Sequence, residues 1–569
     1  MTTQTSSEKD LHHRMTALGD RLIDVVIIGA GINGAGLFRD LCEQGVTCVI
    51  VDKADFGSGT SAASSRLIHG GIKYLETGEL GLVAQSTLER NLLLKNAPHN
   101  VTPLLTVIPI FSWVKGMGAA LGTLFGIKSL ARSRGALLIK AGLALYDFFG
   151  SRERVMPKHR MMSREAVLKE FPGLTRDVKA AGAYYDAQVR HPERLVWELI
   201  RDGLDANPHS AALPYCKVNL QTKDRIRIES EAGDIYDLSP RIVVNAAGPW
   251  IDTVNGALGA TTHLIGGSKG SHLLLDHPEL VAMLKGRMIY FEADNGRICL
   301  VYTYNGFALV GTTDQKAADP DTVSCEAWEV DYFLERLRVL LPGLAIDKHH
   351  IVFAYSGIRP LPASDAANPG LVSRDHSTPL LEPDENRSFP IISLVGGKWT
   401  TFRGFAEEVA DDILPLIKVK RTRSTRDLPI GGGRDFPRDP SARAAWLTRA
   451  TTVTGLSIER LDQLLSRHGT KALVIAQHHG RFTDQDRLPD ASSYSLAELD
   501  WIIENEGVST LSDLVLRRTM LAMEQGLSKA DLEKIGDLFA ALRGWTELEK
   551  QQHLAALITE LRDRHMRSV

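Results

Sequence analysis

The stretch RLIDVVIIGAGINGAGLFRDLCEQGVTCVIVDK, residues 21–53, constrains the fold more than any other part of this 569-residue chain. An apolar run, a glycine turn, apolar residues at helical spacing and a second apolar run predict a strand, a helix and a second strand. Gly29, Gly31 and Gly34 form G-x-G-x-x-G: the first permits a tight turn, the second lets backbone approach a pyrophosphate, and the third lets the helix pack closely on the strand. Asp52 follows about 20 residues later, where a carboxylate binds a ribose hydroxyl. These features predict a dinucleotide-binding unit.

The residues after this unit favour FAD over NAD as the dinucleotide. In KADFGSGTSAASSRLIHGG, residues 53–71, small residues alternate with hydroxyls that could line an extended cofactor. A second G-x-G-x-x-G is missing from the sequence, which argues against an enzyme that binds FAD and NAD together. The cofactor-binding candidates in and before this strip are Asn33, Thr60, Ser61, Ser64, Ser65, Arg66 and Gly70.

Three distant segments carry further turns that suit a flavin. RIVVNAAGPWID, residues 241–252, is a strand that enters a turn of small residues, where backbone can pass close to a ligand. YSGIRPL, residues 355–361, is a stiff loop that sets an arginine between a glycine and a proline. ISLVGGKWTTFRGFAEEVADDIL, residues 392–414, is a strand, two glycines and a helix whose N-terminal amides attract an anion such as a reduced flavin. The cofactor-binding candidates here are Gly248, Gly397, Lys398 and Thr400.

Taken together, the motifs resemble one known family. GAGINGAG, TSAASSRLIHGGIKYLE, NAAGPW, KGSH, GTTD, SGIRPL and GGKWTTFR occur in the order and approximate spacing of the FAD-dependent glycerol-3-phosphate dehydrogenases. The resemblance runs from about residue 20 to near the C-terminus and implies an α/β fold of the D-amino-acid-oxidase-like type. It implies a Rossmann-type FAD-binding domain, an inserted antiparallel-sheet substrate domain and a C-terminal all-helical domain. It also implies oxidation of sn-glycerol 3-phosphate to dihydroxyacetone phosphate, with electrons passed to a membrane quinone.

This oxidation requires a proton acceptor for the hydroxyl, stabilisation of the reduced flavin and cations for the phosphate. Arg359 offers a planar fork for the phosphate or the developing ketone oxygen, and the resemblance places it over the flavin. Lys398, at a helix start beside two glycines, can support both the flavin anion and the substrate oxygen. His272 and His69 both lie in matched motifs, and an imidazole is the side chain whose unperturbed pKa suits a proton acceptor near neutral pH. We expect His272 to be the base and His69 to position the substrate or contact the flavin.

The resemblance also assigns the phosphate to Lys73 and Tyr74. In LVGTTD, the hydroxyls of Thr312 and Thr313 are candidates for a substrate contact, and a β-hairpin with no such contact is the alternative. Lys73 departs from the family, whose members usually carry arginine there; lysine keeps the charge but loses the bidentate geometry. A second departure is the pair Arg190 and His191, in DAQVRHPERLVWEL, which adds positive charge where an acidic pair is more common. The departures leave the identity of the phosphorylated substrate open, although a change at the protein surface is the simpler explanation for the second one.

The motifs and the segments between them divide the chain into domains. Residues 111–150 form a cationic, apolar segment with no acidic residue before Asp147. Such a segment is typical of a peripheral protein that docks on an anionic membrane, the location of a quinone acceptor; helices packed under the substrate domain are the alternative. The expected parts are a flexible tail (1–20), a discontinuous FAD-binding domain (21–110, 186–260 and 350–418), a substrate-binding domain (111–185 and 261–349) and a helical domain (425–569).

The composition bears on whether the protein has disulfides or metals, binds nucleic acid or spans a membrane. The five cysteines are scattered and form no C-x-x-C, which argues against disulfides, structural zinc and iron–sulfur clusters, and no metal site is predicted. The formal net charge of -3 gives no reason to expect nucleic-acid binding. No apolar run is long enough to span a bilayer, so we expect peripheral attachment to the cytoplasmic side of the inner or plasma membrane. Monomer and homodimer both stay open.

Several functions remain as alternatives. A glycerophosphate oxidase would keep the fold and pass electrons to oxygen, and a dehydrogenase of another polyol phosphate, such as an erythritol phosphate, would differ only in substrate. A flavin amine or amino-acid oxidase predicts an arginine for a carboxylate but no preference for phosphate. A non-catalytic flavin-binding scaffold would show no bleaching of the flavin by any substrate.

Overall fold

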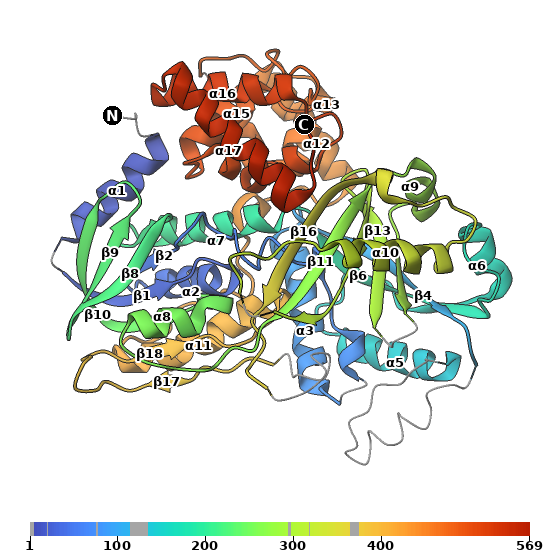
Figure 1. Ribbon diagram of the computed structural model, residues 1–569, viewed down its shortest axis with the longest axis horizontal. Coiled ribbons are helices and arrows are strands. Elements are labelled where there is room, and N and C mark those ends of the chain that lie inside the picture. Colours follow the sequence, from blue (N-terminus) through green and yellow to red (C-terminus); the bar gives the residue numbers. More distant parts are fainter. Residues whose placement is uncertain are drawn as a thin grey trace.

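Two β-sheets lie side by side, and the helices of the C-terminal region lie above them (Figure 1). Below them lie α3 (Leu80–Asn96), α5 (Ala136–Phe149), α8 (Ile251–Ala257) and α11 (Phe402–Leu416). The computed structural model describes residues 5–19, 21–75, 78–113, 135–293, 297–317, 319–364, 375–478 and 480–569.

The first sheet has eight strands and a parallel centre. Its order is β17-β18-β10-β1-β2-β7, with β9 pairing to β10 and β8 to β9. The central strand β1 pairs in parallel with β2 on one side and β10 on the other. Because most of β1, all of β2 and residues 242–244 of β10 are apolar and buried, they suit a position covered on both faces. The strands are β1 (Leu22–Ile28), β2 (Cys48–Val51), β7 (Ala211–Leu213), β8 (Cys216–Thr222), β9 (Arg225–Ser230), β10 (Ile235–Asn245), β17 (Leu380–Leu381) and β18 (Ile391–Ser393).

Helices pack on this sheet as the dinucleotide motif predicts. The crossover from β1 to β2 is α2 (Ile32–Glu43), which packs between α7 (Pro192–Ala206) and α11 (Phe402–Leu416). On α2, Phe38 and Leu41 are fully buried in the core that these helices share with the sheet. The remaining helices of this region are α3 (Leu80–Asn96) and α8 (Ile251–Ala257), with the short 3-10 helices η2 (Gly248–Trp250), η5 (Trp399–Thr401) and η6 (Gly431–Gly433).

The second sheet has ten strands and is almost entirely antiparallel. Its order is β15-β11-β14-β13-β12-β4-β6-β3, with β16 paired to β11 and β5 to β6. The β12–β4 pair is parallel. The strands are β3 (Leu67–Ile68), β4 (Val101–Ile110), β5 (Arg160–Ser163), β6 (Ala180–Val189), β11 (Ser268–Leu275), β12 (Met288–Glu292), β13 (Ile298–Tyr304), β14 (Phe307–Gly311), β15 (Gln315–Lys316) and β16 (Ile351–Arg359). Its helices are α5 (Ala136–Phe149), α6 (Arg164–Glu170), α9 (Pro278–Leu284) and α10 (Ala327–Leu340), with the 3-10 helices η1 (Ile72–Leu75) and η3 (Lys348–His350).

This arrangement confirms the α/β fold with an antiparallel second domain, but the second sheet draws on more of the chain than expected. Strands β3, β4 and β16 lie in ranges that the sequence assigned to the FAD-binding domain. The reason is long-range pairing: β16 joins the sheet by pairing with β11 along almost its whole length. The chain therefore crosses between the two sheets at the residues expected to form the site.

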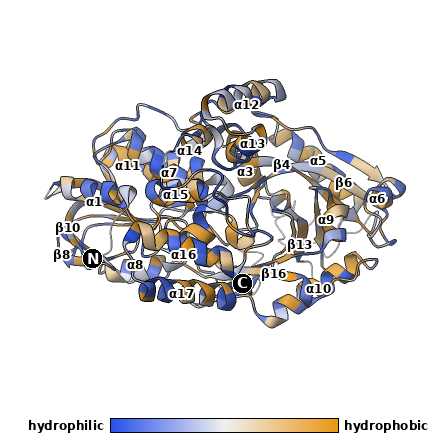
Figure 2. Cartoon of the chain, turned by 90° about the horizontal axis from the view of Figure 1, so that it is seen from above, coloured by the Kyte–Doolittle hydropathy of each residue, from blue (hydrophilic) through white to orange (hydrophobic). Residues whose placement is uncertain are grey.

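The C-terminal part is helical, as expected. Ser495 and Ser528 cap α15 and α16, because their side chains accept hydrogen bonds from the backbone N–H groups of Glu498 and Asp531. Blue and orange residues alternate along α15, α16 and α17, as in helices with one apolar face (Figure 2). Their core is continuous with Phe353 and Tyr355 of β16, so this domain packs on the second sheet. The helices are α12 (Pro440–Thr454), α13 (Ile458–His468), η7 (Gly469–Lys471), α14 (Ala472–Ala476), α15 (Leu496–Asn505), the π-helix η8 (Asp513–Arg518), η9 (Leu521–Met523), α16 (Lys529–Arg543) and α17 (Glu547–His565).

The N-terminal tail was expected to be flexible, and for most of its length this is wrong. Helix α1 (Ser6–Leu18) buries Leu11, Met15 and Leu18, and its first turn carries a capping box between Thr5 and Glu8. The polar composition concealed a helix with one apolar face.

Among the described helices, none is both long enough and apolar enough to cross a bilayer. Most of the expected membrane-docking segment, residues 114–134, lies outside the described residues.

Candidate functional site

A cavity of about 1060 Å³ lies where the two sheets and the helical domain meet. It brings together residues that are up to several hundred positions apart in the chain. The predicted site residues that line it are Gly29, Gly31, Asn33, Asp52, Thr60, Ser61, Ser64, Ser65, Arg66, His69, Tyr74, Gly248, His272, Arg359, Gly397, Lys398 and Thr400.

The turn after β1 forms one end of this cavity. Gly29 has a φ of +106°, and a Cβ there would lie 2.5 Å from the carbonyl oxygen of Ala246. A Cβ on Gly34 would lie 2.0 Å from the carbonyl oxygen of Gly29, so Gly34 lets α2 pack against the turn without lining the cavity itself. Gly31 is the N-cap of α2 and supplies no side-chain cap. The turn therefore presents a helix N-terminus to the cavity, the arrangement that binds a pyrophosphate.

Asp52 joins the end of β2 to this turn. Its carboxylate accepts hydrogen bonds from the backbone N–H groups of Ala30, at 2.7 Å, and Ala54, at 3.0 Å. Burial raises the pKa of Asp52 to about 6, while these two hydrogen bonds act in the opposite direction. Asp52 is thus held at the cavity wall by one hydrogen bond from the glycine turn after β1 and one from the residues that follow β2.

Residues 52–66, which we call the cofactor loop, are held in place by hydrogen bonds to several elements. Thr60 donates to the carbonyl of Ile358 at 2.6 Å, and Ser61 accepts from the N–H of Ile32 at 2.9 Å. At the far end of the loop, Arg66 binds Glu193 with both guanidinium Nη atoms, at 2.8 and 3.2 Å, and is almost fully buried. The side chain of Arg66 therefore anchors the loop through both of its Nη atoms.

His272, on β11, is a buried and neutral histidine. Its Nε2 lies 2.8 Å from Ser65 Oγ, and its ring stacks on Tyr355 with centroids 4.9 Å apart. Burial lowers its pKa well below the usual range, and the positive charges of Arg359 and Arg66 lower it further. A neutral imidazole keeps one nitrogen as an acceptor, as a proton acceptor needs.

Arg359, at the end of β16, lies on the neighbouring strand to His272. Its Nη2 donates to Thr312 Oγ1 at 2.7 Å and to the carbonyl of Thr313 at 3.2 Å. Its Nη1 lies 3.4 Å from Asp314 Oδ1, and the side chain is about one fifth exposed. Thr312 does not line the cavity but holds the guanidinium that does.

Lys398, the N-cap residue of η5, also lines the cavity. Its Nζ lies 3.6 Å from the ring centroid of Tyr74 and donates to Ser86 Oγ at 3.1 Å. Tyr74 in turn stacks on His69, and the N–H of His69 donates to Thr400 Oγ1 at 3.2 Å. The strip after the cofactor loop and the helix start at η5 therefore share one wall.

Other predicted site residues lie off the cavity. The N–H of Gly70 donates to Tyr146 of α5 at 2.8 Å and to Asp186 at 3.2 Å, so it faces a buried polar cluster. Lys73 lies on η1 and is half-buried beside the cavity wall without lining it. Arg190 and His191 also do not line the cavity: Arg190 is exposed, and His191 is the buried N-cap residue of α7.

Tyr355 is a site residue that the sequence analysis missed. It stacks on His272, and its hydroxyl donates to the carbonyl of Ser64 at 3.0 Å. The signal was available, because residues two apart on a strand share a face and Tyr355 stands four residues before Arg359.

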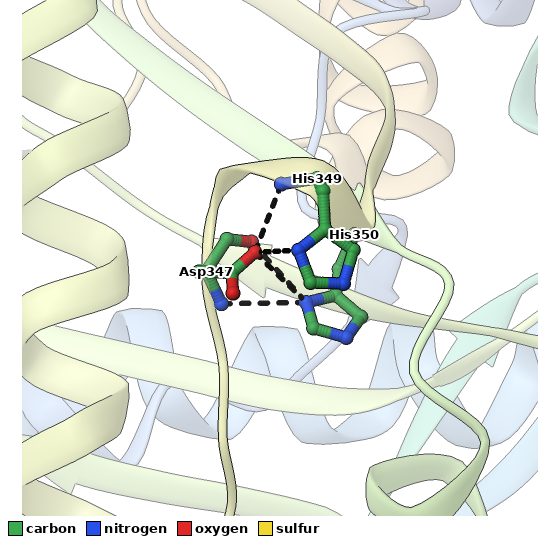
Figure 3. Close-up of side chains that lie close together, drawn as sticks. All are labelled: Asp347, His349 and His350. Atoms are coloured by element: carbon green, nitrogen blue, oxygen red, sulfur yellow. Dashed lines mark hydrogen bonds and ion pairs between the residues drawn. The ribbon is translucent and has the colours of Figure 1, made fainter.

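Outside this cavity, one group of side chains in the described ranges has the composition of a metal site (Figure 3). Asp347, His349 and His350 lie together in the turn before β16. The Asp347 carboxylate accepts from the N–H of His349 at 3.0 Å, and the N–H of Asp347 donates to His350 Nδ1 at 3.3 Å. These hydrogen bonds cap the turn and account for the positions of all three side chains.

The class of protein follows from the dinucleotide turn, the two sheets and the comparison with known families. A family described as "FAD dependent oxidoreductase" matches residues 24–411, and one described as "C-terminal domain of alpha-glycerophosphate oxidase" matches residues 423–550. The chain therefore belongs to the FAD-dependent oxidoreductase family, and its cofactor is FAD.

Individual relatives confirm the more specific resemblance to the glycerol-3-phosphate dehydrogenases. The chain is 31% identical over 527 residues to "Glycerol-3-phosphate dehydrogenase" of Synechocystis sp., covering 88% of this chain and 89% of that protein. It is 26% identical over 578 residues to "Aerobic glycerol-3-phosphate dehydrogenase" of Bacillus subtilis, covering 98% of both. The solved glycerol-3-phosphate dehydrogenase from Bacillus halodurans, complexed with FAD, has the same fold, with a TM-score of 0.74 at 22% identity and 98% coverage of both chains.

The residues at the cavity fit FAD. The glycine turn leaves backbone accessible beside the N-terminus of α2, and Asp52 stands where a ribose partner is expected. Asn33 Oδ1, at this turn, is buried and has no hydrogen-bond partner among the described residues, as expected of an atom that would receive one from a ligand.

Proposed function

We propose that this protein oxidises sn-glycerol 3-phosphate to dihydroxyacetone phosphate, with FAD as the immediate electron acceptor and a membrane quinone as the next. The observation that carries the proposal is the convergence of His272, Arg359 and Lys398, from three separate segments, on the cavity that begins at the dinucleotide turn. The names of the relatives support the choice of substrate.

Each of these three residues has a separate role in the proposed reaction. His272 takes the proton of the C2 hydroxyl on Nε2, the ring nitrogen next to Ser65 Oγ at the cavity, and its lowered pKa keeps it ready as an acceptor near neutral pH. Arg359, fixed by Thr312, stabilises negative charge on the substrate oxygen as the carbonyl forms. Lys398, in contact with Tyr74 and Ser86, adds positive charge at the part of the wall formed by η1 and η5. Bound FAD supplies the two-electron acceptor.

Binding of the phosphate is assigned to the strip around η1. Lys73 and Tyr74 are neighbours there, and Tyr74 lines the cavity. Lys73 does not line the cavity, so it would have to turn its side chain towards Tyr74 to bind the phosphate as a point charge.

Exposed apolar residues support membrane docking. Helix α5 turns Ile139, Leu143 and Tyr146 inward, while Leu137 is 58% and Phe148 is 70% exposed. Trp113, which precedes the segment outside the described residues, is 59% exposed. Exposed apolar side chains of this kind suit the surface of a bilayer, where a quinone acceptor is found.

An oxidase that uses oxygen is the second candidate, because the helical domain matches a family named after alpha-glycerophosphate oxidase. An anaerobic titration of the holoprotein with glycerol 3-phosphate, followed by flavin absorbance, tests both functions. We expect bleaching, then rapid recovery with a soluble quinone analogue and slow recovery in air. Rapid recovery in air would indicate the oxidase, and no bleaching would contradict both.

A further inference from the structure

The helical domain reaches the cofactor loop through a buried carboxylate. Asp55 is completely buried in this loop. Its Oδ2 lies 2.6 Å from Nε of Arg517 and 2.9 Å from Nη1 of Arg518, and its Oδ1 lies 2.8 Å from Nη2 of Arg518. Both arginines belong to the helical domain, so one carboxylate of the FAD-binding region is held by two charges from more than 460 positions away.

The local fold of the helical domain makes this double contact feasible. Arg517 and Arg518 are the last two residues of the π-helix η8. Neighbouring residues on an α-helix point in different directions and do not face one partner. A π-helix is wound more widely, is rare, and occurs frequently at functional sites. Here it directs two consecutive guanidinium groups to Asp55.

A second contact runs from the same π-helix to another wall of the cavity. Asp513 accepts a hydrogen bond from the hydroxyl of Tyr215, and Arg517 also binds Asp513 at 2.6 Å. Tyr215 lines the cavity, and its backbone N–H donates to the carbonyl of Ala54 in the cofactor loop at 3.2 Å. The π-helix thus holds the cofactor loop at two points, directly through Asp55 and indirectly through Tyr215.

Asp55 lies in the loop close to residues that are expected to bind the cofactor. Asp52, three residues earlier, is the expected ribose partner, and Ser58 Oγ donates to the carbonyl of Asp55 at 2.6 Å. A buried carboxylate without a cationic partner is strongly unfavourable, so without the arginines the loop would turn Asp55 towards solvent and lose its present course. Loss of that course would move the groups that line the cavity on both sides of Asp55.

We propose that the helical domain retains the FAD: Arg517 and Arg518, as positioning residues, fix Asp55 and with it the part of the cofactor loop that binds the dinucleotide. This proposal concerns cofactor binding alone and does not depend on which substrate the enzyme oxidises.

The test is the affinity of the full-length protein for FAD after Asp55→Asn, which removes the charge and keeps the shape. Release of FAD from purified holoprotein on dilution is followed by the rise in flavin fluorescence, and circular dichroism follows the chain in the same samples. We expect the dissociation constant for FAD to rise at least about tenfold, while the helical signal is retained.

A matched control is Glu498→Gln. Glu498 is equally buried and accepts hydrogen bonds from Arg460, Arg467 and His468, all within the helical domain and away from the cofactor loop. We expect this variant to lower the unfolding temperature but to change FAD affinity less than about twofold. An equal loss of FAD in both variants would show that general destabilisation is responsible and would overturn the proposal.

Arg517→Lys covers the case in which Asp55→Asn does not fold. It keeps the positive charge but loses the guanidinium geometry, so it should weaken FAD binding less than Asp55→Asn while leaving the fold intact. Unchanged FAD affinity in every Asp55 or Arg517 variant that folds would refute the proposal. Weakened FAD binding together with no oxidation of glycerol 3-phosphate by wild type would leave this proposal standing and remove the proposed function.

Discussion

A single methyl group added at Gly270 should disable the enzyme without unfolding it. Gly270 lies on β11, and a Cβ there would lie 2.1 Å from Nη2 and 2.6 Å from Cζ of Arg359. Ordinary contact distances then require the guanidinium to move by about 1 Å, away from Thr312 and Thr313. A misplacement of this size at a catalytic group costs about 100-fold in rate, equivalent to roughly 2.7 kcal/mol in the barrier. Stability should change by less than about 1 kcal/mol, because the displaced atoms are the end of a flexible side chain.

The assay for Gly270→Ala is steady-state oxidation of glycerol 3-phosphate with a quinone analogue, alongside thermal unfolding and the flavin spectrum. Gly256→Ala is the control, since nothing lies within 4 Å of a Cβ at Gly256. We expect kcat to fall about 100-fold in Gly270→Ala, close to the value of Arg359→Ala, and to stay unchanged in Gly256→Ala. A kcat within threefold of wild type, with Arg359→Ala inactive, would refute the reasoning, as would a loss of activity that follows a loss of folding.

Two further predictions concern pH and the membrane. Because burial lowers the folded-state pKa of His272 while the unfolded chain takes up the proton near pH 6.5, the free energy of unfolding should fall as pH drops below about 6.5. His272→Gln should reduce that fall between pH 8 and pH 5.5 in denaturant titrations, and an unchanged slope would contradict it. Glutamates at both Leu137 and Phe148 should weaken binding to anionic vesicles at least about tenfold in a sedimentation assay. Val453→Glu, an equally exposed site on α12, should bind as wild type does, and equal losses in both proteins would count against docking through α5.

The dinucleotide unit was predictable because its information is local. The spacing of Gly29, Gly31 and Gly34 and the apolar runs on either side fix a strand, a turn and a helix within one short stretch. Helix α1 carried an equally local signal in its capping box and its buried face at Leu11 and Met15, and only its polar composition hid it. In both stretches, the residues that signal the helix or the turn lie within the element itself, and no distant partner is needed to predict it.

The assignment of strands to domains was not predictable in this way. Strand β16 pairs with β11, some 80 positions earlier in the chain, and nothing in YSGIRPL indicates that partner. The same holds for the hydrogen bond between Ser65 and His272, and for the ion pairs between Asp55 and Arg518. Sequence motifs identified several of these residues as members of a site, but their mutual distances depend on long-range pairing that no local pattern records.

The cavity combines two parts that differ in this respect: a cofactor site formed by one continuous segment, and a proposed reaction site formed by long-range strand pairing. The turn at Gly29 and the carboxylate of Asp52 act on any dinucleotide, and both lie in one continuous segment. His272 and Arg359 lie on adjacent antiparallel strands of the other sheet, at a register that sets His272 opposite Tyr355. A shift of that register would leave the dinucleotide turn intact and separate His272, the proposed proton acceptor, from its neighbours at the cavity wall. The proposed reaction therefore depends on the pairing of β11 with β16, and binding of the cofactor on the β1–α2–β2 unit together with, as we propose, the loop that the helical domain holds.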